Sequence, residues 1–180
     1  MPHFLIENEI ELRPWVEGDA GEIFQTVQAN LEHLHTFLHW ATKDYSLQNA
    51  RDFIKQSQVA ADEKKNQSLG VFTGKKLAGS IGFVKFSWEN QSTEIGYWIA
   101  KDFERRGIIT KSCQELINYA FETLEMNRIE IRCATENVKS RRIPEKLGFH
   151  LDGVLRQSQW RHSRFYDMAI YSMLKTEWGK

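Results

Sequence analysis

One glycine, preceded by two arginines and followed by a helix-like pattern, is the best candidate in this chain for binding an anion. The segment runs Arg105, Arg106, Gly107, Ile108, Ile109 and Thr110. The first amides of a helix have no partner inside the helix and lie at the positive end of its dipole, so they can bind a phosphate or pyrophosphate. Gly107 lets the backbone approach closely, and both guanidinium groups could add charge-assisted hydrogen bonds.

The same segment has an ordinary structural explanation. Gly107 could simply be a turn glycine, and Arg105 and Arg106 could be solvated side chains. The segment matches neither the Walker A loop nor the G-x-G-x-x-G fingerprint, so nucleotide-binding folds of those two types find no support.

A second candidate segment begins at Asn137 and reads N-V-K-S-R-R-I-P-E-K-L-G-F. Ser140 could be a capping or first-turn serine of a short helix. Pro144 has no N–H to donate to the carbonyl of Ser140, which a kinked or late-starting helix would leave free. The cluster Lys139, Arg141, Arg142 and Lys146 could attract phosphates or form a solvated helix face.

Hydrophobic periodicity indicates the elements that position these segments. We expect a strand over 5–13, a helix capped by Asp19, a helical stretch near 31–38 and a longer helix over 46–65. A hairpin over 69–87 and a strand over 92–100 follow, and the clearest helical stripe spans 108–125. The remaining elements are expected at 128–133 (strand), 137–147 (helix), 149–156 (strand) and 165–175 (strand). This order predicts one α/β or α+β domain over residues 1–180.

Taken together, the segments resemble the GNAT acetyltransferases, specifically the RimJ/RimL-like group that acetylates protein N-termini. The resemblance rests on the loop ending at Gly107, the N-x-x-S and E-K-L-G-F patterns of 137–149, the strand T-E-I-G-Y-W-I of 93–99 and the ending Y-D-M of 166–168. It implies the GNAT fold, a mixed and mostly antiparallel sheet with flanking helices. In that fold the central strands at 92–100 and 128–134 splay apart.

The resemblance also implies acetyl-CoA as co-substrate, with its pantetheine arm between the two splayed strands. Strand-like pairing with the backbone near Trp98 and Ile99 would orient the thioester. The pyrophosphate would lie on the amides from Arg105 to Thr110. Asn137 would approach the pantetheine and Ser140 the sulfur. The first loop position is usually Gln or Arg in this family. Here it is Glu104, which we expect to point to solvent.

The expected reaction is direct attack of an amine on the thioester, without a covalent enzyme intermediate. A backbone N–H of the 92–100 strand would stabilise the oxyanion, and Ser140 would protonate the leaving thiolate. Some RimL-like enzymes use a carboxylate where this chain has Gln159, which cannot act as a base. Glu94 is the alternative, directly or through a water, although it could equally be a surface carboxylate.

A base that acts weakly or through a water, as Glu94 would, is better suited to an α-amine acceptor than to a lysine. An α-amine has a pKa of ~8, so about a tenth is neutral at pH 7, against well under ~0.1% of a lysine amine. We therefore expect transfer to a protein N-terminus, possible targets including a ribosomal protein. Acetylation of a polyamine or aminoglycoside is the alternative. A cationic amine would need several acidic residues nearby, and Glu32 and Asp44 alone are too little to decide between the two. A non-catalytic acetyl-CoA sensor is a third reading.

Composition limits the other classes. The chain has 180 residues, with 24 basic and 24 acidic side chains and a net charge of zero, so neither nucleic acid nor a membrane surface is an expected partner. Cys113 and Cys133 read as buried reduced thiols, which favours the cytoplasm. His35 and His39 lack a third ligand, so no metal is expected. A homo-oligomer is a possibility that the resemblance raises.

Overall fold

The computed structural model describes residues 2–7 and 9–179. The strands are β1 (Phe4–Ile6), β2 (Ile10–Pro14), β3 (Gln67–Thr73), β4 (Lys76–Ser87), β5 (Ser92–Ile99), β6 (Arg128–Ala134), β7 (His150–Arg161) and β8 (Arg164–Leu174). The α-helices are α1 (Ala20–Ala29), α2 (Leu31–His35), α3 (Leu47–Asp62), α4 (Ile108–Glu122) and α5 (Val138–Lys146). Short 3₁₀ turns cover Glu17–Asp19 and Lys101–Phe103.

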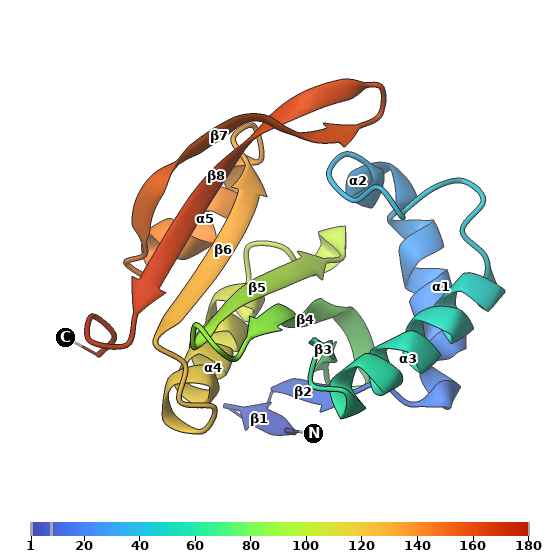
Figure 1. Ribbon diagram of the computed structural model, residues 1–180. Helices are drawn as coiled ribbons and strands as arrows, with labels where there is room; N and C mark the ends of the chain where they lie inside the picture. The colour runs from blue at the N-terminus through green and yellow to red at the C-terminus, as the bar shows by residue number, and fades with distance from the viewer. Residues whose placement is uncertain (1, 8, 180) are drawn as a thin grey trace.

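The strands form one eight-stranded sheet in the order β1-β2-β3-β4-β5-β6-β8-β7. Every neighbouring pair is antiparallel except β5 and β6. That parallel pairing covers only Ser92–Glu94 against Arg128–Glu130, after which the two strands diverge. Figure 1 shows the resulting V between β5 and β6. The expected mixed, mostly antiparallel sheet with splayed central strands is confirmed.

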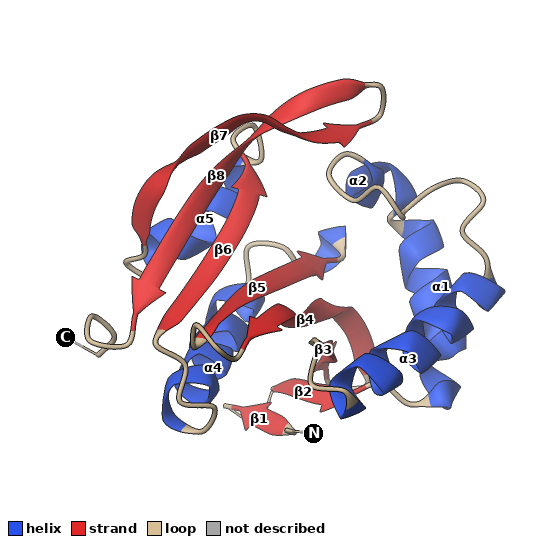
Figure 2. Ribbon diagram, in the orientation of Figure 1, coloured by secondary structure: helices blue, strands red, loops and turns tan. Residues whose placement is uncertain are grey.

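Helices cover both faces of the sheet (Figure 2). α4 packs against β1, β2, β4 and β5, and its apolar stripe (Cys113, Leu116, Ile117, Ala120 and Phe121) lies in the larger core. α1 and α3 pack on the other side, where Trp15, Ile23, Ile54 and Phe72 belong to a second core. Ile108 and Ile109 at the start of α4 are also buried in the larger core, and this end of the helix lies on the open side of the V (Figure 1).

One expectation about the N-terminal region is wrong, and a second holds for the position of a residue but not for its side chain. The stretch 5–13 is not one strand: β1 and β2 pair with each other, and Glu7 between them has a φ of 52° that extended backbone does not allow. Asn8 lies outside the described residues. Asp19 precedes α1 as expected but its side chain does not cap the helix. Its carboxylate instead accepts hydrogen bonds from Arg13 at 2.7 and 2.8 Å and from the Val16 N–H at 2.9 Å.

The other expected elements are present, with ends shifted by a few residues. The largest shift is β7, which runs to Arg161 rather than ending near 156. Within the described residues, no helix is long and apolar enough to cross a bilayer.

Candidate active site

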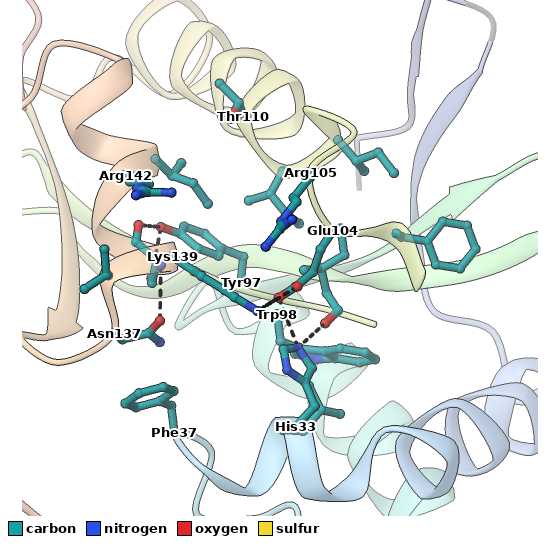
Figure 3. A pocket seen from close by; sticks show the side chains of 18 of the residues that line it. His33, Phe37, Tyr97, Trp98, Glu104, Arg105, Thr110, Asn137, Lys139 and Arg142 are labelled. Carbon is teal, nitrogen blue, oxygen red and sulfur yellow. Dashed lines mark hydrogen bonds and ion pairs between the residues drawn. The ribbon is translucent and has the colours of Figure 1, made fainter. Parts of the chain in front are cut away.

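A cavity of about 630 Å³ opens where β5 and β6 diverge. Its walls come from α2 and the turn after it, the end of β5, the 104–107 loop, the first turn of α4 and the first turns of α5 (Figure 3). The residues expected from the sequence that line it are Trp98, Ile99, Arg105, Gly107, Ile108, Ile109, Thr110, Asn137 and Ser140. Segments about thirty residues apart in the chain thus meet in one cavity, as the sequence predicted.

The 104–107 loop has an unusual backbone. Gly107 immediately precedes α4 with a φ of 73°, and Arg105 has a φ of 63° although it is not a glycine. Such left-handed conformations cost a side-chain-bearing residue about 1–2 kcal/mol. They lead directly into the first turn of α4, whose residues Ile108, Ile109 and Thr110 line the cavity and whose first N–H groups have no partners within the helix.

Arg106 is the one expected binding residue that does not line the cavity. Its guanidinium lies over the ring of Phe103, 5.3 Å from the ring centroid. The two arginines of the loop therefore separate: Arg105 faces the cavity and Arg106 packs beside the 3₁₀ turn that precedes the loop.

The expectation that Glu104 points to solvent is wrong. Its side chain is only 16% exposed, and its carboxylate lies 2.7 Å from Lys139 Nζ on α5 and 3.5 Å from His33 Nε2 on α2. His33 Nε2 is also 3.2 Å from the carbonyl oxygen of Ile99, to which it can donate. The basic groups of two facing elements stabilise the carboxylate in the cleft, which the sequence of the loop alone could not indicate (Figure 3).

Ser140 lies in the first turn of α5. The side-chain oxygen of Asn137 caps this helix by accepting the Ser140 N–H at 3.2 Å. The Ser140 hydroxyl donates to the phenol oxygen of Tyr97 at 3.3 Å, and the Tyr97 hydroxyl donates to the Ser140 carbonyl at 3.0 Å. Burial raises the pKa of Tyr97 well above its usual value, so the phenol stays protonated and remains a donor.

Glu94 is placed differently from the other candidates. It does not line the cavity, and its carboxylate lies 3.2 Å from Lys85 Nζ and 3.5 Å from Arg132 Nε on neighbouring strands. The structure therefore does not bring Glu94 together with Ser140. Gln159 lies on β7, with its side-chain oxygen buried and lacking a hydrogen-bond partner.

Both cysteine thiols are free and buried. Burial raises the pKa of Cys113, and it raises the pKa of Cys133 to about 11 although hydrogen bonding to Ser140 lowers it. A thiol with such a pKa holds almost no thiolate at neutral pH, so neither cysteine is suited to nucleophilic attack. Among the described residues, no group of three or more His, Cys, Asp or Glu side chains is arranged to hold a metal ion.

The β7–β8 hairpin meets the turn after α2 at one end of the cleft. Arg161 donates to the carbonyl of Phe37, and His162 Nε2 lies 2.7 Å from the carbonyl of His35. The two histidine rings also pack, with centroids 3.9 Å apart. The β7–β8 hairpin and the region of α2, which lie near each other at the top of Figure 1, are therefore joined by specific contacts.

Comparison with known proteins identifies the family. The model of the acetyltransferase (GNAT) domain matches residues 9–150. The chain is 34% identical to the "Putative ribosomal N-acetyltransferase YdaF" of Bacillus subtilis (strain 168), over 96% of this chain and 95% of the relative. This protein is a member of the GNAT acetyltransferase family.

Two further relatives bear on this GNAT enzyme. The ribosomal-protein-serine acetyltransferase of Escherichia coli (strain K12) is 24% identical, over 94% of each chain. The structure of the microcin C7 self-immunity acetyltransferase MccE in complex with acetyl-CoA and AMP is 27% identical, with a TM-score of 0.89 over 93% of each chain. The chain is thus an acetyl-CoA-dependent N-acetyltransferase.

The structure adds cavity residues that the sequence reasoning missed, among them Tyr97, His33 and Phe37. In the sequence Tyr97 lies between Glu94 and Trp98, which were both expected in the site. The only sequence signal for its contact with Ser140 was Pro144, which leaves the Ser140 carbonyl without a helical donor. His33 and Phe37 belong to the region of α2, which lies far from the other site segments in the sequence. Tertiary packing brings it to the cleft, so no local sequence signal could indicate these two residues.

Proposed function

We propose that this GNAT enzyme transfers the acetyl group of acetyl-CoA to the N-terminal α-amine of a protein, a ribosomal protein being the first candidate. The observation that carries the proposal is the meeting of the α4 N-terminus and the Ser140 hydroxyl in one cavity, where β5 presents an unpaired edge. The names of the Bacillus subtilis and Escherichia coli relatives support the choice of acceptor. In this proposal one domain over 1–180 carries the activity, in the cytoplasm and without a metal.

Acetyl-CoA lies along the V in this proposal. Its pantetheine pairs with the backbone of Trp98 and Ile99, and Asn137 approaches it from the facing helix. The pyrophosphate takes the amides of Ile108, Ile109 and Thr110, with Gly107 allowing close approach and Arg105 supplying charge. Arg106 is exposed at the edge of the loop and can act only at longer range.

The chemical step is a direct acyl transfer. The amine lone pair forms the new C–N bond, the C–S bond breaks, and its electron pair goes to sulfur. A backbone N–H of β5 stabilises the oxyanion, and the hydroxyl of Ser140 donates to the departing thiolate. The nitrogen loses one proton through water and the sulfur gains one from Ser140. Ser140 then takes up a proton from water, so the transfer from a neutral amine is balanced in protons.

Glu94 remains the proposed proton acceptor, but only through water. Its carboxylate is outside the cavity and paired with Lys85 and Arg132, so a relay is needed to reach the amine. Such a relay suits an α-amine, about a tenth of which is already neutral at pH 7. It suits a lysine amine poorly, and this favours the N-terminal acceptor over a side-chain acceptor.

The test is the release of CoA thiol from acetyl-CoA in the presence of peptides with Ser or Ala N-termini, and separately of polyamines and aminoglycosides. We expect turnover with the peptides and little with the small amines. Turnover confined to the small amines would contradict the proposed acceptor. The Ser140→Ala variant is the internal control for chemistry: turnover should fall while acetyl-CoA affinity, measured by calorimetry, is retained.

A further inference from the structure

The phenol of Tyr97 projects from β5 toward the first turn of α5 (Figure 3). Its side chain lines the cavity beside Ser140, and its oxygen makes two hydrogen bonds, both to Ser140. One reaches the backbone carbonyl of Ser140, at 3.0 Å, and the other involves the Ser140 hydroxyl, at 3.3 Å. Tyr97 thus holds the backbone and the side chain of the same residue.

Pro144 explains why this contact exists. In an uninterrupted α-helix the N–H of residue 144 would donate to the carbonyl of residue 140, but proline has no N–H. Pro144 lies inside α5 and is buried there. The carbonyl of Ser140 is therefore left without its helical partner, and a partly buried carbonyl needs another donor. The Tyr97 hydroxyl supplies that donor from the facing strand.

We propose that Tyr97 is a positioning residue for acetyl transfer, which holds Ser140 opposite the leaving sulfur by donating to the Ser140 carbonyl, while the Ser140 hydroxyl turns its one proton from the Tyr97 oxygen to the sulfur. This inference rests on the role proposed above for Ser140. The Tyr97 hydroxyl links β5 to α5 at the point where the thioester would lie. The distance between β5 and α5 is therefore set partly by one phenol group. Tyr97 does not donate the transferred proton itself.

The geometry separates this role from ordinary core packing. The ring of Tyr97 packs against the large core, and phenylalanine would preserve that packing. Both hydrogen bonds to Ser140 involve the Tyr97 hydroxyl, so Tyr97→Phe removes them and leaves the apolar contacts. Asn137 continues to cap the Ser140 N–H in this variant, which keeps the start of α5 in place.

A double-mutant cycle tests the proposal. The kcat and the KM for acetyl-CoA are measured for the wild type, Tyr97→Phe, Ser140→Ala and the double variant, using any amine that the wild type acetylates. We expect Tyr97→Phe to lower kcat about three- to tenfold, the range for one or two lost hydrogen bonds, with KM changed less than about twofold. In the Ser140→Ala background the same substitution should have no further effect on kcat.

Tyr171→Phe is the matched control. The Tyr171 hydroxyl also contacts α5, but through Glu145 at 2.7 Å and Arg141 at 3.0 Å rather than through Ser140. Any effect of Tyr171→Phe on kcat should therefore be the same with and without Ser140. Thermal unfolding of each variant confirms that the folded protein is being assayed.

The outcomes are distinct. The positioning role is overturned if Tyr97→Phe leaves kcat unchanged. It is also overturned if Tyr97→Phe lowers kcat by the same factor in the Ser140→Ala background as in the wild type. If Ser140→Ala itself has wild-type kcat, the role proposed for Ser140 and the inference about Tyr97 both fail. A change of acceptor from peptide to small amine would contradict only the proposed function, because the cycle uses whichever amine is turned over.

Discussion

Glu104 and Lys139 approach to 2.7 Å across the cavity, joining the 104–107 loop to α5. The carboxylate lines the same cavity as the α4 N-terminus to which we assign the pyrophosphate, and a second negative charge there is unfavourable. Lys139 compensates for this charge while it is paired. A bound pyrophosphate would compete with Glu104 for Lys139, so this ion pair should affect acetyl-CoA affinity.

We predict that Glu104→Gln lowers the KM for acetyl-CoA about two- to fivefold. The effect is limited because the Lys139 side chain is 61% exposed and the pair is screened by solvent. Lys139→Gln should do the opposite and raise KM. Steady-state kinetics at low and high salt check both, and the two shifts should shrink as salt rises. A higher KM for Glu104→Gln would contradict the account.

Arg105 allows the backbone and the charge of the loop to be tested separately. Arg105→Gly removes the guanidinium and relieves the left-handed strain, so its free energy of unfolding should equal or exceed that of Arg105→Ala by up to about 1 kcal/mol. Both variants should raise the KM for acetyl-CoA about three- to tenfold, since each loses a charged hydrogen-bond donor. Denaturant unfolding and kinetics measure the two effects. An unchanged KM in both would remove Arg105 from phosphate binding.

Glu94→Gln tests the proposed water-relayed base through its pH dependence. With a peptide acceptor of α-amine pKa ~8, the base matters most below that pH, where most of the amine is protonated. We expect kcat/KM to fall about tenfold or more at pH 7 and much less at pH 9. An equal loss at both values would point to a structural effect, through the ion pairs with Lys85 and Arg132, rather than to proton transfer.

Asp19 provides a pH-dependent contribution to stability outside the cavity. Burial alone would raise the pKa of this carboxyl, but the Arg13 guanidinium and the Val16 N–H bond it, and its pKa is lowered overall. A lowered folded-state pKa stabilises the protein above the unfolded value of ~3.9, and this stability is lost as pH falls through the folded value. Asp19→Asn should therefore cost about 1–3 kcal/mol at pH 7 and progressively less below pH ~4.

Urea unfolding of the wild type and of Asp19→Asn, at pH 7 and at a pH below ~4, measures this difference in the free energy of unfolding. Glu63→Gln is the control, because Glu63 and Lys65 form an exposed pair with side chains 49% and 70% accessible. That variant should match the wild type within about 0.5 kcal/mol at either pH. A gap for Asp19→Asn that is independent of pH would contradict the assignment.

The sequence was sufficient where local signals were strong. The apolar stripe predicted α4, and the loop ending at Gly107 and the N-x-x-S segment carried the resemblance to the GNAT family, which implied the splayed fold and the elements that meet in the cavity. It was insufficient where a side chain's direction depends on tertiary partners. Glu104 turns inward because Lys139 and His33 face it from other elements. Asp19 bonds Arg13 instead of capping α1 because β2 brings that guanidinium beside it.

The position of the proposed base, Glu94, shows the same limit. Strand alternation placed Glu94 correctly on β5, but whether its carboxylate reached the cavity depended on cations from β4 and β6. Tyr97 was overlooked because an aromatic residue on a strand usually reads as core. Only the missing N–H of Pro144, four residues after Ser140, pointed to a carbonyl that needed a donor from elsewhere.

The most direct test of the central claim is to locate the acetyl group on a peptide that carries both a free N-terminal serine and an internal lysine. The peptide is incubated with the enzyme and acetyl-CoA, and tandem mass spectrometry assigns the modified amine. We predict acetylation of the α-amine with the lysine unmodified, and a rate that falls in the Ser140→Ala variant. Acetylation of the lysine, or of small amines while the peptide stays unmodified, would contradict the account.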